Sequence, residues 1–416
     1  MNVHQQPITT GGIPRMNKYM PVAVLYFFVN SLWLPEGLLY TTLLTPVFIV
    51  WLYNHSALKP IGIYLIASFL YAVIHLLLGI DILFYLKSYL LFTSVFVFVL
   101  SFYQFTRICS SLREIFKKIL ILNFFLLIPA CIAYFLPGLK SIFWMTTDVS
   151  SGLTDFSRLK MFTYEASYYS LLLVPLAFYF LLKMLLLYIP NKALVLLMIV
   201  LPLTLSFAFG TLLGIPLTLL ILFLSDIRLL YLKPATKKAL IISSVILVLL
   251  AFAFVQLFPD NPLFVRLGNI IQGRDSSFKG RVFESLYLAY EVVKEKSLLF
   301  GAGLGQYKLL AIELMSSFYS YTTEVEIVRL SSTVAETFAT FGLTGLFLRF
   351  GAEIYLFFKT RVYTNYYRLA LFIFIFIYQF TGSYLMNIAE YVVWVLAFST
   401  VLPEFNKVRV HEKNIS

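Results

Sequence analysis

Residues 166–188, ASYYSLLLVPLAFYFLLKMLLLY, form an apolar run with a single charged side chain, Lys183. A helix needs about 20 mainly apolar residues to cross the hydrocarbon core of a bilayer. A helix of this length on the surface of a soluble protein would instead carry a polar face. The run therefore predicts a transmembrane helix, and similar runs recur on both sides of it.

The composition of the whole chain supports a membrane protein. Of its 416 residues, 60% are hydrophobic and only 12% are charged, against roughly 25% charged residues in soluble proteins. This composition excludes disordered, coiled-coil, collagen-like and disulfide-rich secreted classes. The net charge of +12 does not indicate a nucleic-acid partner, because the basic residues punctuate apolar runs and form no stripe.

The sequence predicts an all-α fold, a polytopic membrane bundle of about 12 transmembrane helices with a large external loop that carries short amphipathic helices. The expected spans are residues 20–34, 37–53, 60–79, 82–106, 115–136, 166–188, 191–207, 210–226, 238–258, 334–358, 366–386 and 388–402. With the N-terminus inside, the cytoplasmic segments hold 20 Lys and Arg and 5 Asp and Glu, whereas the external segments hold 12 and 15. Because cytoplasmic segments retain positive charge, we expect both termini to be cytoplasmic.

These spans divide the chain into five regions. Residues 1–136 are expected to hold the N-terminal transmembrane helices, 137–165 an external loop, 166–258 the central helices, 259–333 the large external loop, and 334–416 the C-terminal helices with a cytoplasmic tail. No internal repeat indicates the duplicated halves of a transporter. Most polar chemistry gathers outside the spans, which favours binding or catalysis at the external face.

The large loop contains two amphipathic segments. In residues 281–297 the apolar side chains Val282, Leu286, Ala289 and Val293 recur at helical spacing. A second segment runs over residues 307–318. We interpret both as helices on or near the membrane surface, with a small packed cap as the alternative.

Five external arginines are candidate ligands of a phosphate group: Arg158, Arg266, Arg274, Arg281 and Arg329. A guanidinium group matches two phosphate oxygens at once and stays charged. The alternative is ordinary solvation or local ion pairing in the loops.

Two carboxylates stand at the beginning of predicted spans. Glu165 precedes the run at 166–188, and Glu336 lies in the first turn of 334–358. A carboxylate at such a boundary can act as a general base or can stabilise a helix N-terminus. For Glu336 the second role is favoured, and for Glu165 both remain open.

Gly301, Gly303 and Gly305 follow the first amphipathic segment. They lack the strand-and-helix context of a nucleotide-binding loop. Three glycines in five residues instead predict a sharp turn that lets the backbone approach another element or a ligand.

No metal or other cofactor is expected. The four histidines are scattered, with two in the tails, and no cluster has the spacing of metal ligands. Two cysteines are too few for a Cys-rich metal site or a disulfide framework.

Four stretches resemble bacterial O-antigen or capsular polysaccharide polymerases of the Wzy type, within the O-antigen ligase/polymerase superfamily. They are RLKMFTYEASYYS (158–170), LTLSFAFGTLLG (203–214), SSFKGRVFESLYLAYEVVKEKSLLFGAGLGQY (276–307) and SSTVAETFATFGLTGLFLR (331–349). The third resembles the family pattern most closely. Ala166 replaces the usual proline in the first, and the second lacks the arginine of the family's Ser-Arg-x-Gly break.

The resemblance implies a metal-independent glycosyltransferase of lipopolysaccharide and polysaccharide biosynthesis in the bacterial inner membrane. Such an enzyme moves a growing glycan from an undecaprenyl-diphosphate carrier onto an undecaprenyl-diphosphate-linked repeat unit at the external face. Arg158, Arg281 and Arg329 are then expected at the diphosphate, with Arg266 and Arg274 behind them. Glu165 would be the base for the acceptor hydroxyl, and Gly301–Gly305, with Glu336, would shape the cavity.

The expected partners are undecaprenyl-diphosphate-linked oligosaccharides and membrane lipids, with a chain-length regulator and a flippase as further candidates and no nucleic acid. Three other functions stay open, one of them another lipid-linked glycosyltransferase with an acidic residue, Glu36, in its first external loop. An O-antigen ligase would typically carry a histidine just before 334–358, where this chain has IVRLSSTVAE. A lipid-linked oligosaccharide flippase or transporter would more often show short loops and charges inside the spans.

Overall fold

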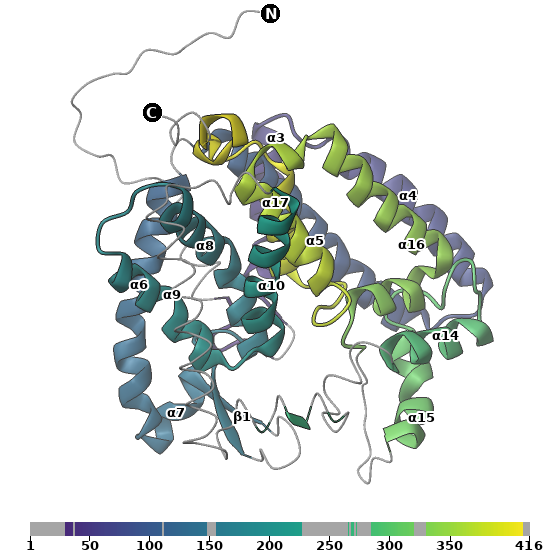
Figure 1. Cartoon of the computed structure of the whole chain (residues 1–416). Coiled ribbons are helices and arrows are strands. Elements are labelled where there is room, and N and C mark those ends of the chain that lie inside the picture. The colour runs from purple at the N-terminus through teal and green to yellow at the C-terminus, as the bar shows by residue number, and fades with distance from the viewer. Residues whose placement is uncertain are drawn as a thin grey trace, which may run out of the picture.

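A computed structural model of the chain describes residues 30–35, 38–109, 112–147, 155–226, 265, 268–269, 272, 284–319 and 330–410. The fold of these residues is mostly helical (Figure 1). The elements are α2 Tyr40–Leu43, α3 Thr45–Asn54, α4 Lys59–Leu77, α5 Ile82–Ile108, α6 Leu112–Tyr134, α7 Pro137–Phe143, β1 Trp144–Thr147, β2 Phe156–Leu159, α8 Ala166–Leu186, α9 Lys192–Ser206, α10 Phe209–Ser225, α14 Ser285–Glu295, α15 Tyr307–Tyr319, α16 Thr333–Lys359, η3 Val362–Thr364, α17 Tyr366–Tyr378, α18 Ile388–Phe398 and η4 Pro403–Phe405.

The long apolar helices fit a membrane helix bundle. Among the described residues, five helices are long and apolar enough to cross a membrane, namely α4, α5, α6, α8 and α16. Four more apolar helices, α9, α10, α17 and α18, have 10–17 residues each. The expected span 238–258 and most of 20–34 lie outside the described residues, so the number of about 12 spans stays a prediction.

Two of the expected spans do not correspond to single continuous helices in the structure. Residues 37–53 contain α2 and α3, because the chain leaves the helix at Leu44 and begins α3 with Pro46 in its first turn. Residues 366–386 hold only α17, which ends at Tyr378, and residues 379–387 form a loop before α18. Asn387 starts α18 by accepting a hydrogen bond on its side-chain oxygen from Ala389 N (3.1 Å).

The apolar helix α8 lies at the centre of the bundle. Of the most apolar window of α8, 78% is buried, against 6% for α4. α8 packs against α9, α10, α17 and α18. Figure 1 shows α6, α8, α9 and α10 standing together, with α4 and α16 on the other side of α5 and α17. Because α4 is apolar yet largely exposed, its outer face suits lipid rather than water.

α16 is two helices joined at a kink. Gly342 has φ 65° and ψ −159°, values that no helix contains. We call residues 333–341 the first half of α16 and residues 343–359 the second half. Such a break leaves backbone groups without helical partners, which is tolerated at membrane depth only where other groups satisfy them.

The predicted glycine turn supplies those partners. Ala302 N donates to Ala339 O (2.8 Å) and Gly303 N to Thr340 O (3.0 Å). In the other direction, Leu343 N donates to Leu298 O (3.0 Å) and Thr344 N to Leu299 O (3.1 Å). The segment 298–303 therefore pairs with both sides of the kink as a short strand would.

Gly301 and Gly342 make this approach sterically feasible. Both have positive φ, 75° and 65°, which glycine adopts without strain. A Cβ atom on Gly301 would lie 2.5 Å from Thr340 C, and one on Gly342 would lie 2.4 Å from Leu299 C. The prediction that the glycine run brings backbone close to another element is confirmed for its first member.

The first amphipathic segment is the helix α14. Its buried side chains are Leu288, Ala289, Val292 and Val293, which pack against Ala335, Phe338 and Ala339 of the first half of α16. Leu286 is instead 37% exposed, and Val282 lies outside the described residues. The apolar stripe of α14 therefore covers protein rather than lipid, which corresponds to the packed-cap interpretation.

We expect Gly301→Ala to lower the free energy of unfolding by roughly 3 kcal/mol or more, because the new Cβ must strain a positive φ and displace backbone atoms. The measurement is the thermal unfolding midpoint of the protein in detergent. Gly351→Ala is the matched control on the second half of α16, where an added Cβ meets no atom within 4 Å. Equal midpoints for the two variants would contradict the backbone contact at the kink.

Candidate active site

One end of the bundle contains a cavity of about 500 Å³. Its walls come from residues 35–42, 84–95, 164–168, 378–387 and from a group around α15 and the start of α16, Tyr307, Lys308, Leu330, Ser331 and Glu336. These segments are loops and helix ends on the side that the predicted topology makes external, together with the first half of α5, which starts on that side. The cavity is therefore the candidate site.

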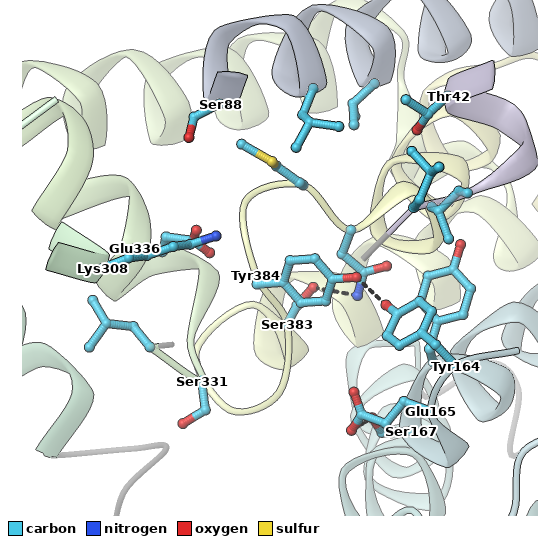
Figure 2. A pocket seen from close by; sticks show the side chains of 18 of the residues that line it. Thr42, Ser88, Tyr164, Glu165, Ser167, Lys308, Ser331, Glu336, Ser383 and Tyr384 are labelled. Carbon is cyan, nitrogen blue, oxygen red and sulfur yellow. Dashed lines mark hydrogen bonds between the residues drawn. The ribbon is translucent and has the colours of Figure 1, made fainter. Parts of the chain in front are cut away.

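Glu165 lies at one end of the cavity beside Ser167 (Figure 2). It occupies the N-cap position of α8 with extended backbone (φ −146°, ψ 142°), yet its side chain makes no capping hydrogen bond. Its carboxylate instead accepts a hydrogen bond from the Ser167 hydroxyl. Of the two roles that the sequence left open for Glu165, the geometry favours a carboxylate that faces the cavity.

Glu336 lies at the opposite end of the view in Figure 2, and it is only 3% exposed. Tyr307 OH donates to its Oε1 (2.7 Å), and Leu385 N donates to its Oε2 (2.6 Å). The cap of α16 is Ser332, whose hydroxyl accepts from Ala335 N (3.3 Å). Ser332 therefore supplies the capping hydrogen bond, while Glu336 keeps its expected place in the first turn of α16 and its carboxylate joins α15 and the α17–α18 loop at the cavity wall.

Two tyrosines also line the cavity, Tyr164 beside Glu165 and Tyr384 towards Glu336 (Figure 2). The hydroxyls of Tyr164 and Tyr384 are hydrogen-bonded to each other, as Figure 2 shows. Tyr164 also packs against Tyr168, with ring centroids 4.8 Å apart. Burial raises the pKa of Tyr164 well above its ordinary value, so its hydroxyl stays protonated at neutral pH. The pair offers neutral hydroxyls and aromatic surface to a ligand.

Two lysines are the cations that line the cavity among the described residues. Lys87 comes from the first turns of α5, and Lys308 from the first turn of α15. Lys308 Nζ lies 6.0 Å from the centroid of the Tyr307 ring. With carboxylates and lysines on its walls, the cavity can bind an anion and accept a proton in the same space.

The glycine turn positions two residues of the cavity wall, Tyr307 and Lys308, without lining the cavity itself. Gly301, Gly303 and Gly305 are not among the residues that line the cavity, but Tyr307 and Lys308 follow them directly. His75 Nε2 donates to Phe300 O (2.8 Å), and the Gln306 side chain exchanges two hydrogen bonds with the Asp81 backbone (2.9 and 3.1 Å). The turn is thereby fixed to the α4–α5 connection as well as to the kink of α16.

Arg158 is the predicted diphosphate ligand that the structure describes. It belongs to β2, which pairs antiparallel with β1 in the register Met145↔Arg158. Its side chain is buried, and Nε donates to Ser206 O (3.1 Å) at the end of α9. Ser206 is the last residue of α9 and α10 begins at Phe209, so Arg158 binds the backbone at the break between these two helices. Arg158 does not line the cavity.

The other predicted arginines, Arg266, Arg274, Arg281 and Arg329, lie outside the described residues, so their role stays a prediction. The sequence analysis did not single out Lys87, Lys308, Tyr307 or Tyr384. Lys87 interrupts the apolar run 82–106, which is a signal that could have been used. Tyr384 carries no comparable signal, because it lies within the expected span 366–386.

A scan against models of protein families finds no match for the chain, and a comparison with curated proteins finds none either.

Proposed function

We propose that the protein is a metal-independent membrane glycosyltransferase, a polysaccharide polymerase. It transfers a growing glycan from an undecaprenyl-diphosphate carrier onto an undecaprenyl-diphosphate-linked repeat unit at the external face of the bacterial inner membrane. The proposal rests on the resemblance of four stretches, 158–170, 203–214, 276–307 and 331–349, to Wzy-type polymerases. The observation that supports it best is a cavity at the predicted external end that combines Glu165 with Lys87 and Lys308.

The proposed reaction forms one bond and breaks one. The acceptor sugar's hydroxyl oxygen attacks the anomeric carbon of the growing glycan, and its proton passes to the Glu165 carboxylate. The bond from that carbon to the diphosphate oxygen breaks, and the electron pair leaves with the carrier diphosphate. Glu165 suits the first role because it faces the cavity with a serine donor holding its carboxylate in place.

The departing diphosphate gains negative charge, which fixed cations stabilise where water is partly excluded. Lys87 and Lys308 can do this from the cavity wall. The predicted arginines Arg281 and Arg329, with Arg266 and Arg274 behind them, would add bidentate contacts. Arg158 would act at the α9–α10 break rather than at the cavity, given its contact with Ser206 O.

The test is a reconstituted assay. Purified protein in lipid vesicles receives lipid-linked repeat units in the presence of a chelator, and the products are separated by length. A ladder of lengthened glycans on the lipid carrier is expected. Transfer of the glycan to a lipid A core acceptor alone would indicate a ligase, and movement of unchanged repeat units across the bilayer would indicate a flippase; either result contradicts the proposal.

Glu165→Gln removes the proposed base and retains the shape of the side chain. We expect kcat to fall by roughly 10²–10⁴-fold, because a positioned base contributes that much, while KM changes little. Initial rates of ladder formation measure both constants. The matched control is Glu114→Gln, an exposed carboxylate on α6 away from the cavity, which should leave both constants unchanged. An unimpaired Glu165→Gln enzyme would rule out this base.

Lys87→Met and Lys308→Met each remove a cation from the cavity wall. We expect each to lower kcat/KM by roughly 10²-fold, because the developing charge on the diphosphate loses a fixed partner. Lys192→Met, at the exposed start of α9, is the matched control. Rates that stay at the level of this control in both cavity variants would show that the diphosphate binds elsewhere.

A further inference from the structure

A buried polar cluster connects the two halves of α16 beneath the cavity. Its members are Arg349 and Glu353 from the second half, Gln379 from the end of α17, and Glu390 from the first turn of α18. Glu390 and Gln379 are fully buried, and Glu353 is 6% exposed. Ionisable groups at such depth in a membrane protein are costly and are usually retained for a functional reason.

Gln379 contacts both halves of α16. Its backbone oxygen accepts hydrogen bonds from the Ser332 hydroxyl (3.2 Å) and from Val334 N (3.3 Å), at the start of the first half. Its side-chain oxygen accepts from Arg349 Nε (2.7 Å), and its amide nitrogen donates to Glu353 Oε2 (3.0 Å), both on the second half.

Glu390 also contacts both halves. Its Oε2 accepts a hydrogen bond from the Thr333 hydroxyl (2.7 Å), at the first residue of the first half. Its Oε1 forms an ion pair with the Arg349 guanidinium. Two residues of neighbouring helices therefore connect the two halves: Glu390 does so through Arg349, and Gln379 does so through Arg349 and Glu353.

Arg349 also holds both ends of the loop 379–387. Gln379 begins this loop, and Glu390 follows it in the first turn of α18. The loop lines the cavity with Ser383 and Tyr384, and its Leu385 N binds the Glu336 carboxylate (2.6 Å). One guanidinium group thus fixes the loop and the first half of α16, which meet at Glu336.

We propose that Arg349 is a positioning residue: through Gln379 and Glu390 it sets the bend of α16 and holds the α17–α18 loop, and thereby places Glu336 and Tyr384 in the cavity. Buried ion pairs are often replaceable by apolar groups without loss of stability. A cluster that joins two halves of one kinked helix to one loop serves geometry instead. The activity readout of this role rests on the proposed function, whereas the exchange readout described next does not.

Hydrogen–deuterium exchange of the full-length protein in lipid nanodiscs tests the proposal. Arg349→Met should speed amide exchange in residues 332–341 and 379–387 by about tenfold or more, because these segments open locally when the cluster is broken. Residues 345–359 and the central helix α8 should keep wild-type exchange. The matched control is Lys407→Met, which breaks the ion pair of Lys407 Nζ with Asp226 Oδ2 (3.2 Å) away from the cavity.

Arg349→Lys is the second variant, because Arg349→Met leaves two carboxylates without their partner and can prevent insertion. Lysine retains the charge but cannot contact Gln379 and Glu390 with a planar fork. We expect faster exchange in the same two segments by several-fold. Unchanged exchange there in a folded variant, or a uniform increase over every helix, overturns the proposal.

The activity readout is a double-mutant cycle between Arg349→Met and Glu336→Gln in the polymerisation assay. If Arg349 acts by placing Glu336, the double variant loses no more than the more impaired single variant, whereas independent residues give multiplied losses. If the Arg349 variants exchange faster only in residues 332–341 and 379–387, but the wild-type protein does not polymerise, the proposed function is refuted and the positioning role stands. Polymerisation with unchanged exchange and multiplied losses would refute the positioning role alone.

Discussion

The backbone contact between Gly301 and Gly342 is the constraint on which the candidate site depends. A helix broken at membrane depth exposes peptide groups that neither lipid nor water can satisfy there. The segment 298–303 satisfies them with four hydrogen bonds across the kink. Because the turn is also bound to His75 and Asp81, the break in α16 is attached to the α4–α5 connection. The cavity wall at Tyr307, Lys308 and Glu336 is built on this junction.

Two short helices also belong to this bundle. α17 and α18 have 13 and 11 residues, too few to cross a bilayer unaided. The loop between them lies against protein, and its polar groups find partners in Glu336, Arg349 and the first half of α16. The loop 379–387 is thus a stretch of irregular backbone at the cavity wall.

The long helices and the glycine turn could be predicted from the sequence, because apolar runs and closely spaced glycines each have one dominant structural role. Apolar runs gave the long helices α4, α5, α6 and α8 to within a few residues, and three glycines in five residues predicted a close backbone approach. Glu165, at the boundary of a span, does face the cavity. The hydrophobic pattern could not locate the kink, because Gly342 lies within a run whose hydropathy continues on both sides.

Charge counting could not reveal the buried polar cluster for a related reason. The charges counted on the cytoplasmic side include Arg349, Glu353 and Arg368. The linear sequence shows nothing more about these side chains. In the structure Arg349 lies in the buried cluster, and Arg368 donates to Thr360 O (2.8 Å) and Ala397 O (2.9 Å) at the ends of α16 and α18. An arginine that satisfies the last carbonyls of a helix is indistinguishable in sequence from one in solvent. The separation of Glu165 from Lys308 and Glu336 along the cavity (Figure 2) likewise arises only in three dimensions. On the proposed function, the acceptor hydroxyl lies beside Glu165 and the departing diphosphate lies towards Lys308. The Tyr164–Tyr384 pair then lies near the glycosidic bond that is broken.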